Sequence, residues 1–206
     1  MKKILLTVLL GLGVLNTASA IEGNADTGKT KSVACMACHG LDGNGPIPMY
    51  PKLAGQSASY IAKQLADFKL GMTSGGKEGR ADPIMGGMSM ALSEQDMADL
   101  GAYFAAQTMA AGTDTTNALG KKLYLGGDAS RGITACVACH GVSGKGMDSA
   151  GFPVIGQQNA AYTKSQLEKF RSGARANDKA GMMRKIAMKL EDADIEALTE
   201  YIASLK

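Results

Sequence analysis

The chain carries apolar residues at three- and four-residue spacing over much of its length, which predicts amphipathic helices. In the segment 57–71, Tyr60, Gln64, Leu65 and Phe68 fall at helical spacing, and Gly71 is expected to end the helix. No stretch shows the strict alternation of apolar and polar residues that is typical of a half-buried strand. The pattern therefore predicts an all-α protein.

A second amphipathic helix is predicted over 92–107, with Ser93 as its N-cap and Asp96 three residues later. The segment 190–205 repeats its apolar face. The residues on the two faces are Met97, Leu100, Phe104, Ile195, Leu198 and Ile202. Further helices are expected to lead into two cysteine-containing segments, over about 24–38 in the first half of the chain, and over about 117–125 and 132–139 in the second.

The predicted elements form two copies of one unit. Two pairs of segments match at a constant offset within each pair: 50–71 with 152–173, and 85–105 with 183–203. A period of about 100 residues is too long for a solenoid and indicates a duplicated domain. Small and polar residues in 109–120 suit a linker. We expect one domain over 21–113 and a second over 114–206.

The first twenty residues have the features of a secretory signal peptide. Lys2 and Lys3 precede an apolar run of about a dozen residues, which is short for a bilayer span, and Ala18-Ser19-Ala20 fits the small-x-small cleavage rule. We expect residues 1–20 to be removed after Ala20 on export, and an uncleaved membrane anchor is the alternative. Loss of the two lysines lowers the formal charge from +3 to +1. Because no basic block is present, nucleic-acid binding is not indicated.

All four cysteines lie in two C-x-x-C-H motifs at equivalent positions of the repeat. The motif residues are Cys35, Cys38 and His39, and Cys136, Cys139 and His140. A Cys2His2 zinc site would need a second pair of ligands near each motif. A thioredoxin-like dithiol would need a βαβ pattern, and a plain disulfide would not explain the histidine. C-x-x-C-H is the attachment motif of c-type haem, so two covalently bound haem c groups are predicted, each with the histidine as an axial ligand of the iron.

Bound haem would also fill the interior of each domain. The chain has no Trp, four Phe and six Tyr, but 27 Gly. Domains of about 90 residues with so few large side chains bury limited apolar surface by themselves. We therefore expect haem to form much of each core.

The second axial ligand is expected to be methionine. Both histidines of the chain belong to the motifs, so neither iron can have two of them. The thioether of methionine is the remaining soft ligand, and it raises the reduction potential. The repeat pairs Met85 with Met183 and Met90 with Met188. We favour the first pair, which is expected in loop sequence ahead of the final helix of each domain, and keep the second as the alternative.

The chain resembles the dihaem cytochromes c of the cytochrome c4 family over essentially its whole mature length. The resemblance rests on the segments CMACHGLDGNGP, YPKLAGQSASYIAKQLADFK, CVACHG, GFPVIGQQNAAYTKSQLEKFRSG, NDKAGMMRK and DIEALTEYIASL. It implies two tandem class I cytochrome c domains related by a pseudo-twofold axis. It also implies Met85 and Met183 as axial ligands. The chain departs from the family's pattern in having two adjacent methionines, which makes Met182 a competitor of Met183. The ring nitrogen of each histidine that faces away from iron is then expected to donate to a backbone carbonyl near Pro51 or Pro153.

Iron with histidine on one side and methionine on the other has no open coordination position, which favours one-electron transfer over catalysis. The resemblance implies a periplasmic carrier that takes electrons from a redox protein, such as a quinol-oxidising complex, towards a terminal oxidase. Loose association with the membrane stays open. The alternative is the dihaem cytochrome subunit of a larger oxidoreductase, such as a flavocytochrome c sulfide dehydrogenase. A dihaem peroxidase would be longer and would need a further ligand or base.

Several other polar residues have predictions of their own. Tyr60 and Tyr162 are expected to pack in the core or at an interface. Arg175, Asn177 and Asp178 precede the second methionine segment. Hydrogen bonds to haem propionates and a solvated surface loop are both open for these three residues.

Overall fold

The computed structural model describes residues 21–206, so the predicted signal peptide lies outside the described residues. Within that range all named elements are helices, which confirms the all-α prediction. Extended pairing within the same range is limited to two isolated bridges, Asp128 with Ile133 and Met147 with Phe152. None of the described helices is long and apolar enough to cross a membrane.

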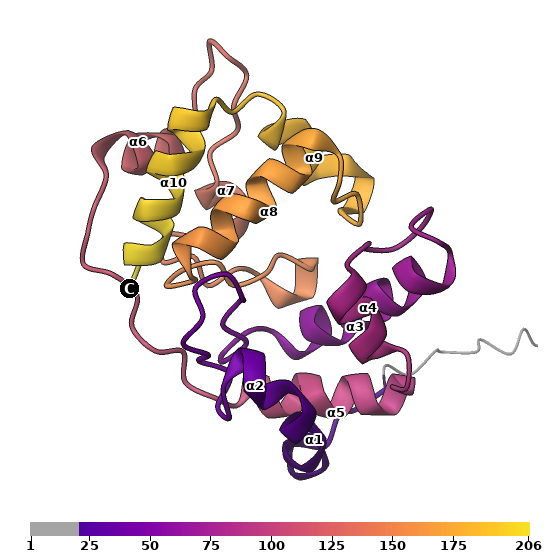
Figure 1. The fold of residues 1–206 in the computed structure, drawn as a ribbon. Helices are drawn as coiled ribbons and strands as arrows, with labels where there is room; N and C mark the ends of the chain where they lie inside the picture. The colour runs from indigo at the N-terminus through magenta and orange to yellow at the C-terminus, as the bar shows by residue number, and fades with distance from the viewer. Residues whose placement is uncertain (1–20) are drawn as a thin grey trace, which may run out of the picture.

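The helices fall into two groups along the chain (Figure 1). The first group comprises α1 (Ala25–Lys31), α2 (Met36–His39), α3 (Ala58–Thr73), α4 (Pro83–Ser89) and α5 (Glu94–Ala105). The second comprises α6 (Ala118–Gly126), α7 (Val137–His140), α8 (Ala160–Ser172), α9 (Met182–Ala187) and α10 (Asp192–Ser204). Short 3-10 turns lie at η1 (Ser32–Cys35), η2 (Asp148–Ala150) and η3 (Lys179–Gly181).

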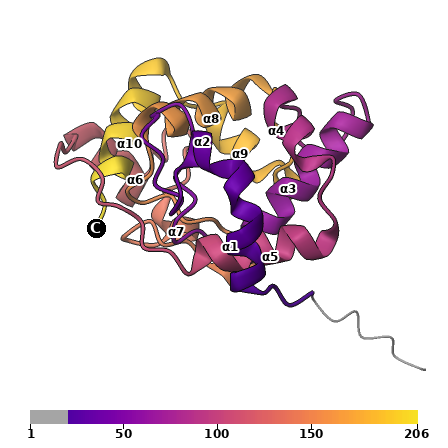
Figure 2. The ribbon, with the colours of Figure 1, turned by 60° about the horizontal axis from the view of Figure 1, so that its bottom comes forward.

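Each group folds into a lobe, which we name the first lobe (21–107) and the second lobe (118–206). In the first lobe, α1 and α3 pack on α5, and α4 packs on α3 (Figures 1 and 2). In the second lobe, α6 and α8 pack on α10, and α9 packs on α8. The helices therefore correspond one for one, α1 to α6, α3 to α8, α4 to α9 and α5 to α10. The extended segment 108–117 joins the lobes and contains the expected boundary between residues 113 and 114.

The last helix of each lobe forms where the sequence predicts it. Ser93 caps α5 in a capping box with Asp96, as expected. Glu191 has the same role at α10, where a serine is absent. The predicted apolar faces of both helices are buried. In the first lobe the main cluster of buried apolar side chains has only four members, Ile61, Leu100, Tyr103 and Phe104, which agrees with the small core inferred from composition.

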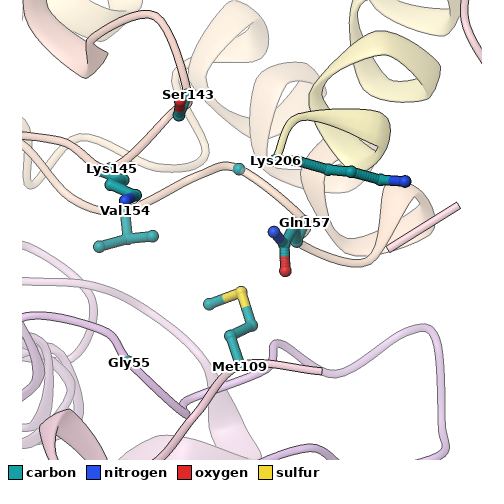
Figure 3. A pocket seen from close by; sticks show the side chains of 8 residues that line it. Gly55, Met109, Ser143, Lys145, Val154, Gln157 and Lys206 are labelled. Carbon is teal, nitrogen blue, oxygen red and sulfur yellow. The ribbon is translucent and has the colours of Figure 1, made fainter. Parts of the chain in front are cut away.

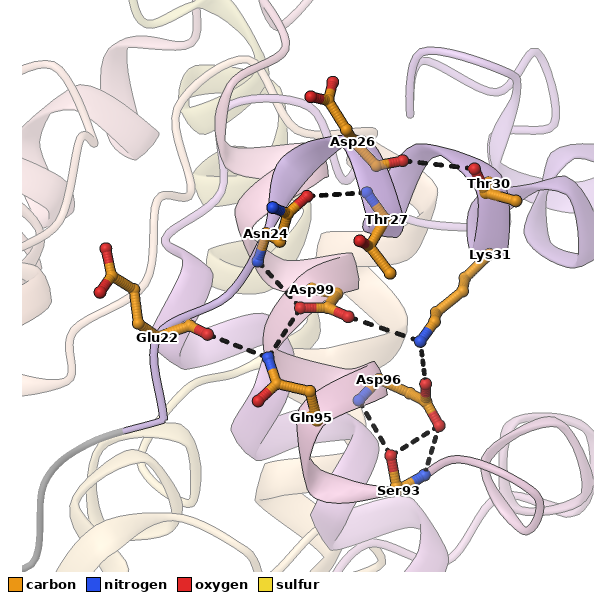
Figure 4. A network of polar contacts seen from close by, with 10 residues as sticks. All are labelled: Glu22, Asn24, Asp26, Thr27, Thr30, Lys31, Ser93, Gln95, Asp96 and Asp99. Atoms are coloured by element: carbon orange, nitrogen blue, oxygen red, sulfur yellow. Dashed lines mark hydrogen bonds and ion pairs between the residues drawn. The ribbon is translucent and has the colours of Figure 1, made fainter.

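A polar network fixes α1 against α5 (Figure 4). Asp99 of α5 accepts a hydrogen bond from the backbone N–H of Asn24, at 2.8 Å, and Nζ of Lys31 lies 3.4 Å from its second oxygen. In the second lobe Arg131 reaches Asp194 of α10 at 2.6 Å. These pairs hold the segment before each cysteine motif against the final helix of the same lobe.

The lobes meet through a reciprocal exchange of glutamine side chains. Gln56 donates to the carbonyl of Val154 (2.8 Å) and accepts from its N–H (2.9 Å). Gln158, the repeat counterpart of Gln56, makes the same two bonds with the backbone of Lys52, at 2.9 and 2.8 Å. Lys52 and Val154 are also counterparts in the repeat. The interface therefore has the pseudo-twofold symmetry that the resemblance implies.

The side chain of Lys52 ties the connecting segment to both lobes. Its Nζ donates to the carbonyls of Ala110 (2.8 Å), Ala111 (3.3 Å) and Gln157 (3.0 Å). The residue is buried, and burial lowers the pKa of its ammonium group. Three carbonyl dipoles thus replace the water that would otherwise solvate this cation.

The prediction that Gly71 ends its helix is wrong, because α3 continues to Thr73. Its repeat counterpart, Gly173, does follow the end of α8, with a φ of +79°. A Cβ atom on Gly71 would lie 2.4 Å from the carbonyl oxygen of Arg80. Glycine is therefore needed here for the close approach of the chain around Arg80 to α3, not for a helix end.

Replacing Gly71 by Ala is expected to lower the free energy of unfolding. Alanine favours a helix over glycine by about 1 kcal/mol, but the added Cβ must displace backbone, and overpacking costs about 1–3 kcal/mol. Gly126→Ala is the matched control, since no heavy atom lies within 4 Å of its added Cβ. Chemical denaturation of both variants measures the difference. A Gly71→Ala protein as stable as the parent would contradict this packing argument.

Candidate metal centres

Each C-x-x-C-H motif forms a single helical turn. In the second lobe the N–H groups of Cys139 and His140 both donate to the carbonyl of Cys136, at 3.2 and 2.9 Å. In the first lobe η1 and α2 build the corresponding turn, with Cys35 at the end of η1. Residues at positions i, i+3 and i+4 share one face of such a turn. The two thiols and the imidazole of each motif therefore lie on the same side.

All four cysteines are free thiols of intermediate burial, so neither motif forms the disulfide considered above. Burial raises the pKa of the Cys35 thiol, and it raises that of Cys136 to about 11. A redox-active dithiol requires a lowered thiol pKa, whereas burial shifts those of Cys35 and Cys136 in the opposite direction. Among residues 21–206, no three His, Cys, Asp or Glu side chains are grouped so that they could hold a metal ion. Two thiols and one imidazole instead fit a haem, whose vinyl groups would bond the thiols and whose iron, already held by four porphyrin nitrogens, would take the imidazole as a ligand.

The imidazoles of both motifs are buried and held in one orientation. Nδ1 of His39 lies 3.0 Å from the carbonyl oxygen of Pro51, and Nδ1 of His140 lies 3.0 Å from that of Pro153. These contacts confirm the predicted hydrogen bonds. A carbonyl can only accept, so Nδ1 carries the hydrogen and Nε2 has its lone pair available for a metal. Burial lowers the pKa of each histidine more than the carbonyl raises it, which favours the neutral, ligating form.

Folded loops carry the two proline carbonyls to the imidazoles. Gly43 accepts a hydrogen bond from the N–H of Leu53 at 2.7 Å, and Gly144 accepts the equivalent bond from Ile155 at 2.7 Å. Each bond closes a loop that begins directly after the motif. Pro51 and Pro153 lie two residues before Leu53 and Ile155, the donors of these bonds, and are thereby placed beside the histidine of the same lobe.

Met85 and Met183 lie in short helices, α4 and α9, so the expectation of loop structure is wrong for both. At α4 the physical reason is capping by Asp82. Asp82 accepts from the N–H groups of Ile84 and Met85, at 3.1 and 3.0 Å, which starts α4 two residues before the methionine. At α9, Asp178 accepts from the N–H of Arg184 at 3.0 Å.

The methionines that compete with this pair are more exposed. Met90, Met182 and Met188 are 42%, 38% and 64% exposed, whereas Met85 and Met183 are of intermediate exposure. Met183 also packs against the buried cluster of the second lobe, as Cys136 does. The structure thus places one partly buried methionine at an equivalent position in each lobe.

A buried polar cluster between the lobes was missed by sequence analysis. Arg80 and Arg175 face each other there and share the side-chain oxygens of Gln64 and Gln166. The surface-loop alternative is therefore wrong for Arg175, which is buried, and Asn177 also bonds into this cluster. The repeat could have drawn attention to the glutamines, which are exact counterparts. The arginines lie outside the matched blocks.

A hollow of about 410 Å³ lies elsewhere at the junction of the lobes (Figure 3). Its lining residues are Gly55, Met109, Ser143, Lys145, Val154, Gly156, Gln157 and Lys206. None of the predicted cysteine, histidine or methionine ligands lines it. The hollow is therefore separate from the candidate metal centres.

Comparison with known proteins covers both lobes. The family model for cytochrome c matches residues 25–107 and 118–206. Cytochrome c4 of Stutzerimonas stutzeri is 48% identical over the whole of both chains. The crystal structure of reduced recombinant cytochrome c4 from Pseudomonas stutzeri has a TM-score of 0.86 and 46% identity, covering 89% of this chain and 100% of its own. The thiosulfate dehydrogenase electron acceptor of Stutzerimonas stutzeri strain A1501 is 38% identical, over 84% of this chain and 80% of its own.

The full-length identity, the two family matches and the agreement in fold all point to the same kind of protein. The chain belongs to the cytochrome c4 family of dihaem cytochromes c, and it is an electron carrier, not an enzyme, with two covalently bound c-type haems.

Proposed function

We propose that Cys35 and Cys38 attach one haem to the first lobe, and that Cys136 and Cys139 attach the other to the second lobe. One observation carries this proposal. In each lobe the histidine after the second cysteine is held through Nδ1, on the same side of the turn as both thiols. Thioether bonds from the two cysteines of a motif would hold the haem on the side of the turn where Nε2 is free to bind iron.

We further propose His39 and Met85 as axial ligands in the first lobe, and His140 and Met183 in the second. The equivalent positions of Met85 and Met183 on α4 and α9 support this choice, as does their lower exposure. The contact of Met183 with the core cluster favours it over Met182, its more exposed neighbour.

With both axial positions filled by side chains, no position on the iron is left for a substrate. The role of the protein is then to hold the iron and to set its reduction potential. The haem, when bound, supplies the one-electron change between ferric and ferrous iron. The carbonyls of Pro51 and Pro153 fix the imidazole tautomer and increase its basicity. The thioether ligands favour ferrous iron and so raise the potential. We place the domain boundary between residues 113 and 114, within the segment that joins the two family matches.

Replacing Met85 or Met183 by Leu is expected to remove the weak near-infrared band of sulfur-ligated ferric haem from one haem only. Leucine has a similar volume but no sulfur, so the potential of one of the two Nernst steps should also fall. An optical redox titration measures both effects. Met90→Leu and Met182→Leu are matched controls that should keep the full band. Loss of half the band in Met182→Leu, with no loss in Met183→Leu, would assign the second ligand to Met182.

We propose that the mature protein works in the periplasm. The sequence of residues 1–20, with Lys2 and Lys3, an apolar run and Ala18-Ser19-Ala20, supports export. N-terminal sequencing of protein isolated from the periplasmic fraction is expected to begin at Ile21. A protein of full length retained in the membrane fraction would instead indicate an uncleaved anchor.

We propose a terminal oxidase as the electron acceptor and a quinol-oxidising complex as the donor. The alternative is that the protein accepts electrons from a dehydrogenase as its cytochrome partner. The 38% identity to a thiosulfate dehydrogenase electron acceptor supports that second candidate.

Purified ferrous protein is expected to be reoxidised by membranes that contain a terminal oxidase, with matching oxygen uptake that cyanide abolishes. Affinity purification from the periplasm at native expression should then yield the protein without a stoichiometric partner, because carriers form transient complexes. Recovery of an equimolar dehydrogenase subunit, together with no membrane oxidation, would favour the alternative.

A further inference from the structure

One peptide group of the first lobe is hydrogen-bonded at both of its polar atoms. Nδ1 of His39 donates to the carbonyl of Pro51, at 3.0 Å. The N–H of the same peptide group belongs to Lys52, and it donates to Oε1 of Gln158 at 2.8 Å. The peptide bond is trans, so its C=O and N–H point in opposite directions. Two hydrogen bonds in line therefore lead from the histidine ring of the first lobe to a glutamine of the second.

The second lobe contains the counterpart of this arrangement. Nδ1 of His140 donates to the carbonyl of Pro153, at 3.0 Å. The N–H of that peptide group belongs to Val154, and it donates to Oε1 of Gln56 in the first lobe, at 2.9 Å. Each glutamine thus bonds to the peptide group that holds the histidine of the other lobe.

Both glutamine side chains are held in one orientation and are shielded from water, since Gln56 and Gln158 are buried. Each Oε1 also accepts from the N–H of the next residue, Ser57 or Asn159, at 2.9 Å. Each Nε2 donates to a carbonyl of the other lobe. A backbone N–H can only donate and a carbonyl can only accept, so a flipped amide would lose these bonds. The oxygen therefore stays on the N–H of the peptide group that holds the histidine.

Hydrogen bonds in such a chain strengthen one another. When the N–H of a peptide group donates, electron density moves towards its carbonyl oxygen, which becomes a better acceptor. The better acceptor draws the Nδ1 hydrogen further from the imidazole and increases the basicity of Nε2. A more basic imidazole ligand stabilises ferric iron more than ferrous iron, so it lowers the reduction potential.

We propose that Gln158 tunes the iron bound by His39, and that Gln56 tunes the iron bound by His140. The proposal rests on these histidines being axial ligands, as proposed above. The glutamines are positioning residues, because they act on iron only through a peptide group and an imidazole. Each lobe thereby lowers the reduction potential of the haem in the other lobe, and both potentials depend on the contact between the lobes.

The first test is nuclear magnetic resonance of the ferrous dihaem protein labelled with nitrogen-15 histidine. The chain has only two histidines, so each Nδ1–H gives one signal. In Gln158→Leu the proton signal of His39 should move to higher field, and by more than that of His140, because its hydrogen bond is weakened. Gln56→Leu should give the reverse. Equal shifts of both signals, no shift, or a larger shift in the substituted lobe would overturn the proposal.

Two further variants separate this effect from a loosened interface. Asn159 donates across the same interface, at 2.8 Å, to the carbonyl of Tyr50, whereas the carbonyl that holds His39 is that of Pro51. Asn159→Leu removes this bond and should move neither signal comparably. Gln158→Glu retains an acceptor oxygen, so the His39 signal should not move to higher field. A movement as large as in the leucine variant would overturn the proposal.

The second test is a redox titration of the two leucine variants. One Nernst step should rise in each, that of the first-lobe haem in Gln158→Leu and that of the second-lobe haem in Gln56→Leu. The haem methyl signals of the ferric protein, followed during the titration, assign each step to a lobe. A fall in potential, or a rise for the haem of the substituted lobe only, would overturn the proposal.

Two measurements on the unsubstituted protein complete the test. Scalar coupling across the hydrogen bond should join the amide nitrogen of Lys52 to the side-chain carbon of Gln158, and its absence would overturn the proposal without any variant. Axial ligation has its own readout, because a macrocycle shifts the ring protons of a histidine beneath it to much higher field. Absence of that shift would refute ligation by the histidine. Its presence without the crossed response would refute only the role of the glutamines.

Discussion

One hydrogen bond in each lobe determines which nitrogen of the histidine can bind iron. The carbonyls of Pro51 and Pro153 accept from Nδ1 at 3.0 Å, so the hydrogen of the neutral ring sits there and Nε2 keeps its lone pair. Burial lowers the pKa of each ring below that of a surface histidine, which favours the neutral form. A backbone hydrogen bond at Gly43 or Gly144 closes the loop after each motif. This closed loop places the proline carbonyl beside the histidine ring.

The two lobes are small, and their relative position is specified by polar contacts. Gln56 and Gln158 each pair with a backbone N–H and carbonyl of the opposite lobe, and both glutamines are buried. Leaving any of these groups unpaired would cost about 1–3 kcal/mol. Hydrogen bonds also depend on direction, which an apolar contact does not. The interface can therefore fix orientation as well as distance between the two haem-bearing lobes.

Sequence analysis predicted the features that depend on local periodicity and on the repeat. The cap at Ser93, the buried face of Met97 and its neighbours, and the duplicated fold follow from such signals. Gly71 was misassigned because helix-ending and close-packing glycines look alike in sequence, and the contact with Arg80 is tertiary. Met85 was expected in a loop because seven-residue helices such as α4 are too short to show periodicity. Burial supports the proposed choice among the methionines of each lobe, and the sequence alone does not contain it.

The arginine cluster shows a further limit of repeat-based reasoning. Arg80 follows Phe68 by twelve positions, whereas Arg175 follows Phe170 by only five, so no alignment of the halves pairs them. The structure makes them equivalent because each guanidinium stacks on the counterpart phenylalanine and reaches the same two glutamines. The two guanidinium groups are therefore related by the pseudo-twofold axis, whereas the backbone segments that lead to them are not. Each half supplies one arginine to the cluster, although the loops that carry Arg80 and Arg175 differ in length.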